Sequence, residues 1–312
     1  MFKIGKVKLE NNIILAPMAG VNCGAFRLLC KEYGAGLTTT AMVVANNLVN
    51  NKEQNIKTLD LTRNEHPISI QLVGNDSNLM GKAAELIEPY ADIIDINLGC
   101  PEKDILALKA GSFLIKHPEQ IEKVISPVIS ATNKPVTAKI RIGWDENSIN
   151  TLETVKILED LGVSAIAIHG RTKSQKYTGK ADWNEIKKAK EKSNVPIIGN
   201  GDITLPGHAK SMIEQTGCDA VMIGRGAIGN PLIFKSTSYL LNEGKNLDDL
   251  NEDDQIQSFF RFCELFEKQE RQKFSEFRQH AMWFTKGLMG AAKMRKKILS
   301  IKRVDKIKRL FE

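Results

Sequence analysis

The stretch Ile93-Ile94-Asp95-Ile96-Asn97-Leu98-Gly99-Cys100-Pro101 has the pattern of a buried strand that ends abruptly in a tight turn. Its apolar, β-branched first half is typical of a strand covered on both faces, and Gly99 and Pro101 are poor continuations of one. The turn would place the Cys100 thiol at the carboxyl end of the strand, where α/β enzymes carry their chemistry. Taken alone, Cys100 could also be a packing residue, because free cysteines are often buried.

Seven other short β-rich runs accompany this strand along the chain. They are residues 13–17, 37–42, 68–73, 136–140, 165–169, 196–199 and 220–223. Amphipathic segments separate most of them, at residues 80–91, 118–131, 148–161, 183–192 and 205–215. Strand–helix alternation predicts a parallel sheet, and eight units over roughly 240 residues predict an α/β fold of the (β/α)8 TIM-barrel type. A doubly wound open sheet is the alternative, weakened because no G-x-G-x-x-G follows the first strand.

The pattern changes after Phe234. Residues 236–254 are polar and rich in Asn and Asp, which predicts a connector that is partly helical at 237–241. From Gln255 to Phe311 the apolar residues recur only at helical spacing. We therefore expect a barrel domain at residues 1–240 and an all-helical C-terminal domain at residues 241–312.

Composition limits the classes of protein to consider. Of the 312 residues 42% are hydrophobic, yet no run of about 18 apolar residues suggests a membrane span. The first residues lack the apolar core of a signal peptide. The five cysteines are scattered without a C-x-x-C pair, which argues against a zinc site and a disulfide framework. We expect a cytoplasmic protein without metal.

Positive charge gathers near the C-terminus. After Ala292 nine Lys and Arg residues face only Asp305 and Glu312, within a chain of net charge +7. A solvated helix face is the commoner meaning of such a run, and a phosphate-contacting surface is the alternative. The charge pattern by itself favours the solvated face.

Two glycine turns follow the last two predicted strands. Gly199-Asn200-Gly201-Asp202 follows the seventh strand, and Gly224-Arg225-Gly226 follows the eighth. Glycine lets backbone N–H groups approach an anion, and TIM barrels frequently bind phosphate with the loops after strands seven and eight. Either turn alone could be a plain loop. Together they predict a phosphorylated ligand.

Polar residues end several of the predicted strands. Gln71, Asn97, Lys139 and His169 belong, with Cys100, to the same end of the predicted barrel. Lys139 could be a lysine reaching out at the rim, and His169 a structural histidine. Their convergence favours a site instead, because a buried ammonium needs an anionic partner.

A flavin mononucleotide (FMN) suits this set of groups. Lys139 could stabilise negative charge at the N1/O2 side of the reduced ring, and Gln71 could bind the ring edge. The backbone of Pro17, Met18 and Ala19 could pack beside it. Cys100 would then face the substrate and could donate a proton.

Six segments match the pattern of one known family, and they occur in the family's order. They are Ala16-Pro17-Met18-Ala19-Gly20-Val21, Asp95 through Pro101, Lys139-Ile140-Arg141-Ile142-Gly143-Trp144, Ile168-His169-Gly170-Arg171-Thr172, Gly199-Asn200-Gly201-Asp202-Ile203 and Met222-Ile223-Gly224-Arg225-Gly226. With them the chain closely resembles the tRNA-dihydrouridine synthases, and among them the bacterial B-type. Arg278-Gln279-His280 and the residues after it resemble, more loosely, that family's helical RNA-binding domain.

The resemblance implies an FMN enzyme that reduces the C5–C6 double bond of selected uridines in tRNA, with NADPH or NADH as reductant. Cys100 would be the catalytic proton donor to C5, while Asn97 and Arg171 would hold the uracil. The implied FMN contacts are Pro17, Met18, Ala19, Gln71, Lys139, His169, Asn200, Gly201, Asp202, Gly224 and Arg225. A uridine in folded RNA must be extruded into such a pocket, so other groups of the protein must bind the phosphates around it. The resemblance therefore favours RNA contacts at Lys293, Arg295, Lys296 and Lys297.

Three other functions stay open from the sequence. Ribosomal RNA could be the substrate in place of tRNA, and the chain could be a small-molecule FMN reductase of the dihydroorotate-dehydrogenase type. A non-catalytic RNA-binding protein on a barrel scaffold is the third, disfavoured by the joint presence of Cys100, Lys139 and His169. We expect a monomer that binds no membrane. No nicotinamide fingerprint distinguishes NADPH from NADH.

Overall fold

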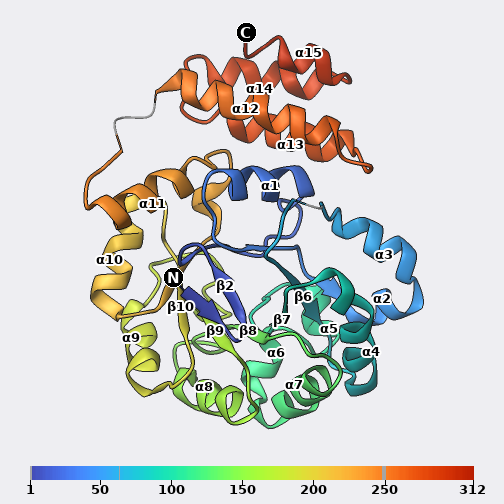
Figure 1. The fold of residues 1–312 in the computed structure, drawn as a ribbon, viewed down its shortest axis with the longest axis vertical. Helices are drawn as coiled ribbons and strands as arrows, with labels where there is room; N and C mark the ends of the chain where they lie inside the picture. Colours follow the sequence, from blue (N-terminus) through green and yellow to red (C-terminus); the bar gives the residue numbers. More distant parts are fainter. Residues whose placement is uncertain (1, 63, 248–250) are drawn as a thin grey trace.

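The computed structural model describes residues 2–62, 64–247 and 251–312 and shows parallel strands ringed by helices (Figure 1). The main sheet runs in the order β3 (Ile13–Leu15), β11 (Ala220–Ile223), β10 (Ile197–Asn200), β9 (Ala165–His169), β8 (Val136–Arg141), β7 (Ile93–Asn97), β6 (Ile68–Val73) and β4 (Thr38–Thr39). A parallel bridge from Ile14 to Leu37 nearly closes the ring. The predicted TIM barrel is therefore confirmed.

Two features of the barrel differ from the sequence-based expectation. Of the strand expected at 37–42 only β4 forms, and a second short strand, β5 (Val43–Val44), follows it; the two pair with different parts of β6. An antiparallel hairpin, β1 (Phe2–Ile4) and β2 (Val7–Leu9), was not expected at all. Its strands have three residues each, too few to show a period of two. Ile4 and Leu9 pack into the barrel interior and close its amino-terminal end.

Helices surround the barrel. They are α1 (Gly24–Glu32), α2 (Ala45–Asn50), α3 (Lys52–Leu59), α4 (Ser77–Ile87), α5 (Lys103–Ala107), α6 (Ser112–Lys116), α7 (Ile121–Ser130), α8 (Thr151–Asp160), α9 (Trp183–Lys192), α10 (Pro206–Thr216) and α11 (Ile233–Glu243). Three short 3-10 turns occur at Glu88–Tyr90, Pro118–Gln120 and Arg225–Ala227. The α4, α7, α8, α9 and α10 positions agree with the five predicted amphipathic segments.

Along each strand, successive side chains face alternately the barrel interior and the core under the helices. Ile94 and Ile96 of β7 belong to the large core under the helices, whereas Ile93 belongs to the barrel-interior cluster. Asp95 and Asn97 follow Ile93 at the strand period of two and so face the interior as well. The interior therefore changes from apolar near the hairpin to polar at the carboxyl ends of the strands.

Four helices form the C-terminal part: α12 (Glu252–Glu267), α13 (Phe274–Phe284), α14 (Ala291–Ser300) and α15 (Val304–Lys308). No strand occurs in the described part of this region, as predicted. The helix expected at 237–241 within the connector is confirmed as the end of α11, which runs to Glu243. The expected boundary at 240/241 therefore falls inside that helix, and residues 248–250 of the connector lie outside the described residues. No helix of the described chain is long and apolar enough to cross a bilayer.

The C-terminal helices pack against the barrel through α1 and the loop that precedes it. The His280 side chain on α13 is buried and donates its Nε2–H to the Val21 carbonyl at 2.9 Å. Its ring also packs against Phe26 of α1 and Phe262 of α12. Burial lowers the pKa of His280 to about 4.

His280 should therefore make the folded protein sensitive to acid. Its pKa in the unfolded chain is about 6.5, so the unfolded state binds the extra proton first as pH falls. The stability that the neutral ring contributes is lost below about pH 6.5, amounting to about 2 kcal/mol between pH 8 and pH 5. His280→Gln, which keeps an N–H donor for Val21, should reduce this acid sensitivity in denaturant titrations. The same replacement of the exposed His66 should leave the acid sensitivity unchanged. If the free energy of unfolding depends on pH equally in His280→Gln and in the unaltered protein, the assignment is contradicted.

Candidate active site

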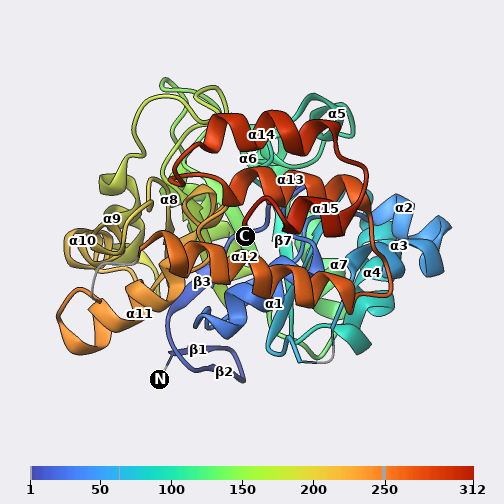
Figure 2. The same ribbon diagram turned by 90° about the horizontal axis from the view of Figure 1, so that it is seen from above.

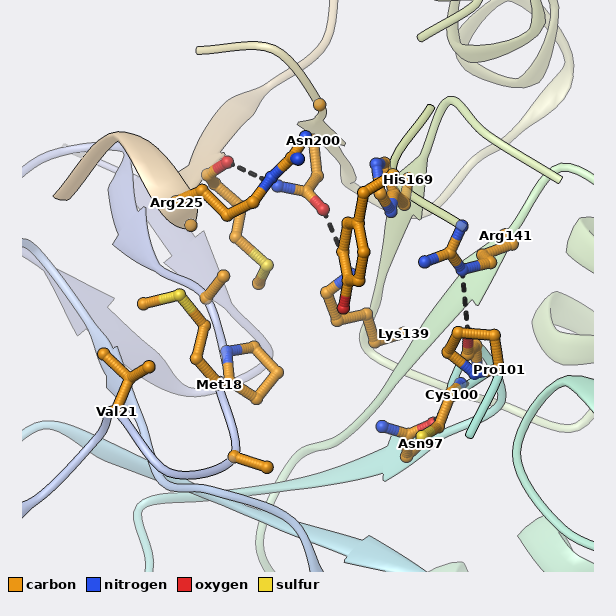
Figure 3. A pocket seen from close by; sticks show the side chains of 18 of the residues that line it. Met18, Val21, Asn97, Cys100, Pro101, Lys139, Arg141, His169, Asn200 and Arg225 are labelled. Carbon is orange, nitrogen blue, oxygen red and sulfur yellow. Dashed lines mark hydrogen bonds between the residues drawn. The ribbon is translucent and has the colours of Figure 1, made fainter. Parts of the chain in front are cut away.

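A cavity of about 430 Å³ opens at the carboxyl ends of the barrel strands (Figure 3). All the expected FMN contacts line it: Pro17, Met18, Ala19, Gln71, Lys139, His169, Asn200, Gly201, Asp202, Gly224 and Arg225. Asn97 and Cys100 line the same cavity. The convergence predicted from the strand ends is therefore present in the folded chain.

Lys139 lies at the wall of this cavity, on β8. Its ammonium donates to the Asn200 Oδ1 at 3.1 Å, and the Asn200 Nδ2 donates to the Met222 carbonyl at 2.7 Å. Burial, reinforced by repulsion from Arg141, lowers the pKa of Lys139 to about 8. No carboxylate among the described residues forms an ion pair with this ammonium. An anionic ligand in the cavity would therefore stabilise its charged form and raise its pKa again.

His169 ends β9 beside the same wall. Burial, together with the positive charge of Lys139 and Arg141, holds the pKa of His169 well below its usual range. The ring is therefore neutral near pH 7, and its Nε2 lies 3.4 Å from an Arg171 nitrogen that can only donate. This contact leaves the proton on Nδ1.

The two glycine turns come together as the sequence predicted. A Cβ on Gly226 would lie 2.2 Å from the Ile203 carbonyl oxygen, so only glycine lets these two backbones approach so closely. The backbone N–H groups of Gly201, Asp202 and Arg225 have no backbone acceptor within the part of the chain described. They are free to bind an anion such as a phosphate.

The loop after β3 forms the opposite wall. The Asn22 amide nitrogen ties this loop together by donating to the carbonyls of Ala16 at 2.8 Å and Thr39 at 2.7 Å. The buried Arg27 guanidinium holds the Asn22 carbonyl at 2.7 Å and pairs with the buried Glu65 carboxylate. Met18 is thereby placed at the cavity on a braced loop.

The Cys100 thiol lies at the cavity mouth on a turn held at three points. The Asn97 Oδ1 accepts from the Cys100 N–H at 2.8 Å, Arg141 Nε donates to the Gly99 carbonyl at 2.9 Å, and the Ser112 N–H donates to the Cys100 carbonyl at 3.0 Å. Figure 3 shows Asn97 beside Cys100 and Arg141 reaching toward the turn. Burial raises the pKa of Cys100, so the group at this position is a protonated thiol at neutral pH.

Arg171 does not reach the cavity. Its guanidinium is buried and donates to the Thr178 and Gly179 carbonyls and to the Asp202 carboxylate. These bonds occupy the side chain, so the expected contact with a uracil ring stays a prediction that would require rearrangement. In this structure Arg171 instead holds Asp202 and the 178–179 loop in place.

The four basic residues expected to contact RNA lie on α14, outside the cavity. Lys293, Arg295, Lys296 and Lys297 are all exposed. Figure 2 shows α14 toward the same end of the molecule as α5, which follows the Cys100 turn, and opposite to β1 and β2. A large polyanion bound over the cavity mouth could therefore also meet α14.

The site contains residues that the sequence-based list lacked. Arg141 and Tyr177 line the cavity, and the Tyr177 ring lies between two guanidinium groups, 5.5 Å from Arg141 and 4.8 Å from Arg225. Arg141 could have been inferred from its place at the end of the fifth strand. Tyr177 gave no signal, because it lies in a long loop whose path depends on tertiary contacts.

Comparisons with known proteins agree with this site. A family model described as dihydrouridine synthase matches residues 14–311. The chain is 44% identical over 250 residues to tRNA-dihydrouridine synthase B of Vibrio parahaemolyticus, covering 80% of this chain and 77% of that protein. It is 36% identical over 287 residues to the Shewanella oneidensis protein of the same name, covering 90% and 88%.

Solved structures with a similar fold include two oxidoreductases. Histamine dehydrogenase from Rhizobium sp. 4-9 aligns with a TM-score of 0.60 at 12% identity, over 85% of this chain and 50% of that one. The old yellow enzyme homologue from Zymomonas mobilis aligns with a TM-score of 0.53 at 15% identity, over 80% and 94%. At such identities these two support the barrel fold alone. The family model and the sequence relatives, which span most of the barrel and the helices behind it, show that the chain belongs to the dihydrouridine synthase family.

Proposed function

We propose that this protein reduces the C5–C6 double bond of uridines in tRNA to give dihydrouridine, using FMN in the barrel cavity and NADPH or NADH as reductant. One observation carries the proposal. A protonated thiol, Cys100, lies in the same cavity as a buried cation, Lys139, and a glycine cradle with free N–H groups. Membership of the dihydrouridine synthase family supplies the reaction type.

The residues present fit an FMN. The phosphate would meet the N–H groups of Gly201, Asp202 and Arg225, with the Arg225 guanidinium beside them. Lys139 would lie against the electron-rich edge of the ring, where an anionic ligand would offset the burial that lowers the pKa of this ammonium. Met18 would pack against the ring on the side of the braced loop.

When bound, the flavin supplies hydride to C6 of the uracil. The residues of this chain then have two tasks. Asn97 lines the cavity beside Cys100, where its amide could help to orient the base. Cys100 keeps a proton at Sγ and can deliver it to C5, which suits a thiol with a raised pKa better than a nucleophilic thiolate.

The choice of tRNA rests on the relatives, which are named for it, and on charge. The exposed Lys and Arg residues of α14 offer a phosphate-binding surface beyond the cavity. Such a surface is unnecessary for a small-molecule FMN reductase of the dihydroorotate-dehydrogenase type. Ribosomal RNA has the same backbone charge, so the RNA class must be tested directly.

The test is to delete the gene and quantify dihydrouridine at each position of every tRNA and rRNA by mass spectrometry. We expect loss at specific tRNA positions, restored in vitro by the purified protein with NADPH. Loss confined to rRNA would establish the alternative RNA substrate. A purified protein without flavin absorbance, or one that turns over orotate instead of tRNA, would overturn the proposal.

A further inference from the structure

Beneath the cavity, a carboxylate lies in the barrel interior without a basic partner. Asp95 on β7 is 4% exposed and forms no ion pair within the part of the chain described; the positive charge of Lys139 acts on it without direct contact. Its two oxygens accept from neutral donors only: Thr137 Oγ1 on β8 at 2.6 Å and Gln71 Nε2 on β6 at 2.6 Å. The three residues are register partners on adjacent strands. A buried acid held in this way is costly to fold, so it invites a functional explanation.

From Asp95 a chain of hydrogen bonds leads to the Cys100 turn. The Gln71 Oε1 accepts from the Asn97 Nδ2 at 2.8 Å. The Asn97 Oδ1 in turn accepts from the backbone N–H groups of Gly99 at 3.0 Å and Cys100 at 2.8 Å. Five residues on two strands and one turn thus form a single relay.

The chemistry at its two ends allows this relay only one direction. Backbone N–H groups can only donate, so Asn97 must turn its oxygen to Gly99 and Cys100 and its nitrogen to Gln71. Gln71 must then present its oxygen to Asn97 and its nitrogen to the next group, which must accept. Asp95 is that acceptor. Without it, Gln71 could rotate by half a turn and turn its nitrogen toward the Asn97 nitrogen. Two donors would then face each other, which weakens the hold on the Asn97 amide and so on the Cys100 N–H.

We propose that Asp95 is a positioning residue that fixes the orientation of Gln71 and Asn97, and through them the Cys100 turn. The inference rests on the proposed function, in which Cys100 must meet C5 of the uracil. Because Gln71 and Asn97 both line the cavity, the relay also determines what they offer a ligand. The Asn97 oxygen accepts two backbone N–H groups, and its second N–H faces the weak acceptor Met42 Sδ at 3.6 Å. Gln71 keeps one N–H that is not used in the relay and can donate to a carbonyl oxygen of a bound ring.

The test compares two replacements of Asp95. Asp95→Asn can still accept from Gln71 and keeps the relay direction, whereas Asp95→Leu removes the acceptor. We expect Asp95→Leu to lower kcat for dihydrouridine formation by about 100-fold, the effect of an ångström-scale misplacement. KM for tRNA should stay within about threefold of the unaltered enzyme, and Asp95→Asn should recover most of kcat. Rates are compared per bound flavin, because Gln71 is also an expected flavin contact. Thr137→Val, which removes the other donor to Asp95 but leaves the relay intact, is the matched control.

A second measurement does not depend on flavin or RNA. Cys100 and Cys23 are half-buried while Cys30, Cys218 and Cys263 are buried, so peptide mass spectrometry is needed to follow iodoacetamide labelling at Cys100 separately from Cys23. We expect several-fold faster labelling in Asp95→Leu, because the turn is released, and an unchanged rate in Asp95→Asn and Thr137→Val. Equal labelling in Asp95→Leu and the unaltered protein would overturn the inference, as would a loss of activity shared equally by all three variants. If the unaltered enzyme formed no dihydrouridine, the proposed function would fail while labelling still tested the relay.

Discussion

Cys100→Ala is expected to slow dihydrouridine formation by about 1000-fold while flavin reduction by NADPH stays within about threefold of normal. The Cys100 thiol lies at the mouth of the cavity, away from the glycine turns that would hold the phosphate. Its removal takes away the proton for C5 and leaves the flavin-binding groups in place. Rapid mixing under anaerobic conditions separates the two half-reactions.

The pH dependence of the uridine step provides a further check on the same residue. Burial raises the pKa of Cys100, and only the form below that pKa can donate a proton. The rate should therefore not fall until the pH exceeds about 8.5, the ordinary value for a thiol. Cys263→Ala, a change of the same size at a buried thiol on α12, should keep full activity. Loss of flavin from Cys100→Ala with unchanged activity per bound flavin would show that the thiol is structural.

Neutralising the α14 surface should weaken tRNA binding by about 100-fold at physiological salt. The variant replaces Lys293, Arg295, Lys296 and Lys297 by Gln. If each contacts one phosphate, the slope of log K against log salt should become shallower by about three. Filter binding or fluorescence anisotropy over a range of salt concentrations measures both quantities.

The matched control removes charge from the other end of the barrel. Lys3, Lys6 and Lys8 of the β1–β2 hairpin are exposed and lie on the side opposite α14 (Figure 2). Their replacement by Gln should leave the salt slope nearly unchanged. Arg295 also donates to the Thr285 hydroxyl at 3.0 Å, so thermal unfolding must confirm that α14 stays folded. If the salt slope of tRNA binding were unchanged in the α14 variant, these charges would be a solvated helix face that does not contact RNA.

Much of the site could be predicted from local sequence. In parallel strands the carboxyl ends share one edge, so residues at successive strand ends must converge once the strands are identified. That reasoning brought Gln71, Asn97, Lys139 and His169 together, and the eight strands required no knowledge of tertiary contacts. The hairpin at the amino terminus was missed because three-residue strands carry too little pattern.

Side-chain roles required the folded structure. Arg171 and Arg141 look alike in the sequence, each at or just after a strand end, and both donate to backbone carbonyls in the fold. Only Arg141 also lines the cavity, whereas Arg171 pairs with Asp202. Asp95 looks like an ordinary polar residue in an apolar run. Its importance depends on the register of β6, β7 and β8, which places Gln71 and Thr137 on either side of it.

The sequence by itself thus determined the barrel, the end of the barrel that is expected to carry the chemistry and the presence of the Cys100 thiol at that end. These follow from hydrophobic periodicity and from glycine and proline placement, which are properties of neighbouring residues. Only the tertiary structure decided which polar groups have free hydrogen-bonding capacity. That capacity depends on partners distant in the chain: the Asn97 amide that holds Cys100 is oriented by Gln71, and Gln71 by Asp95.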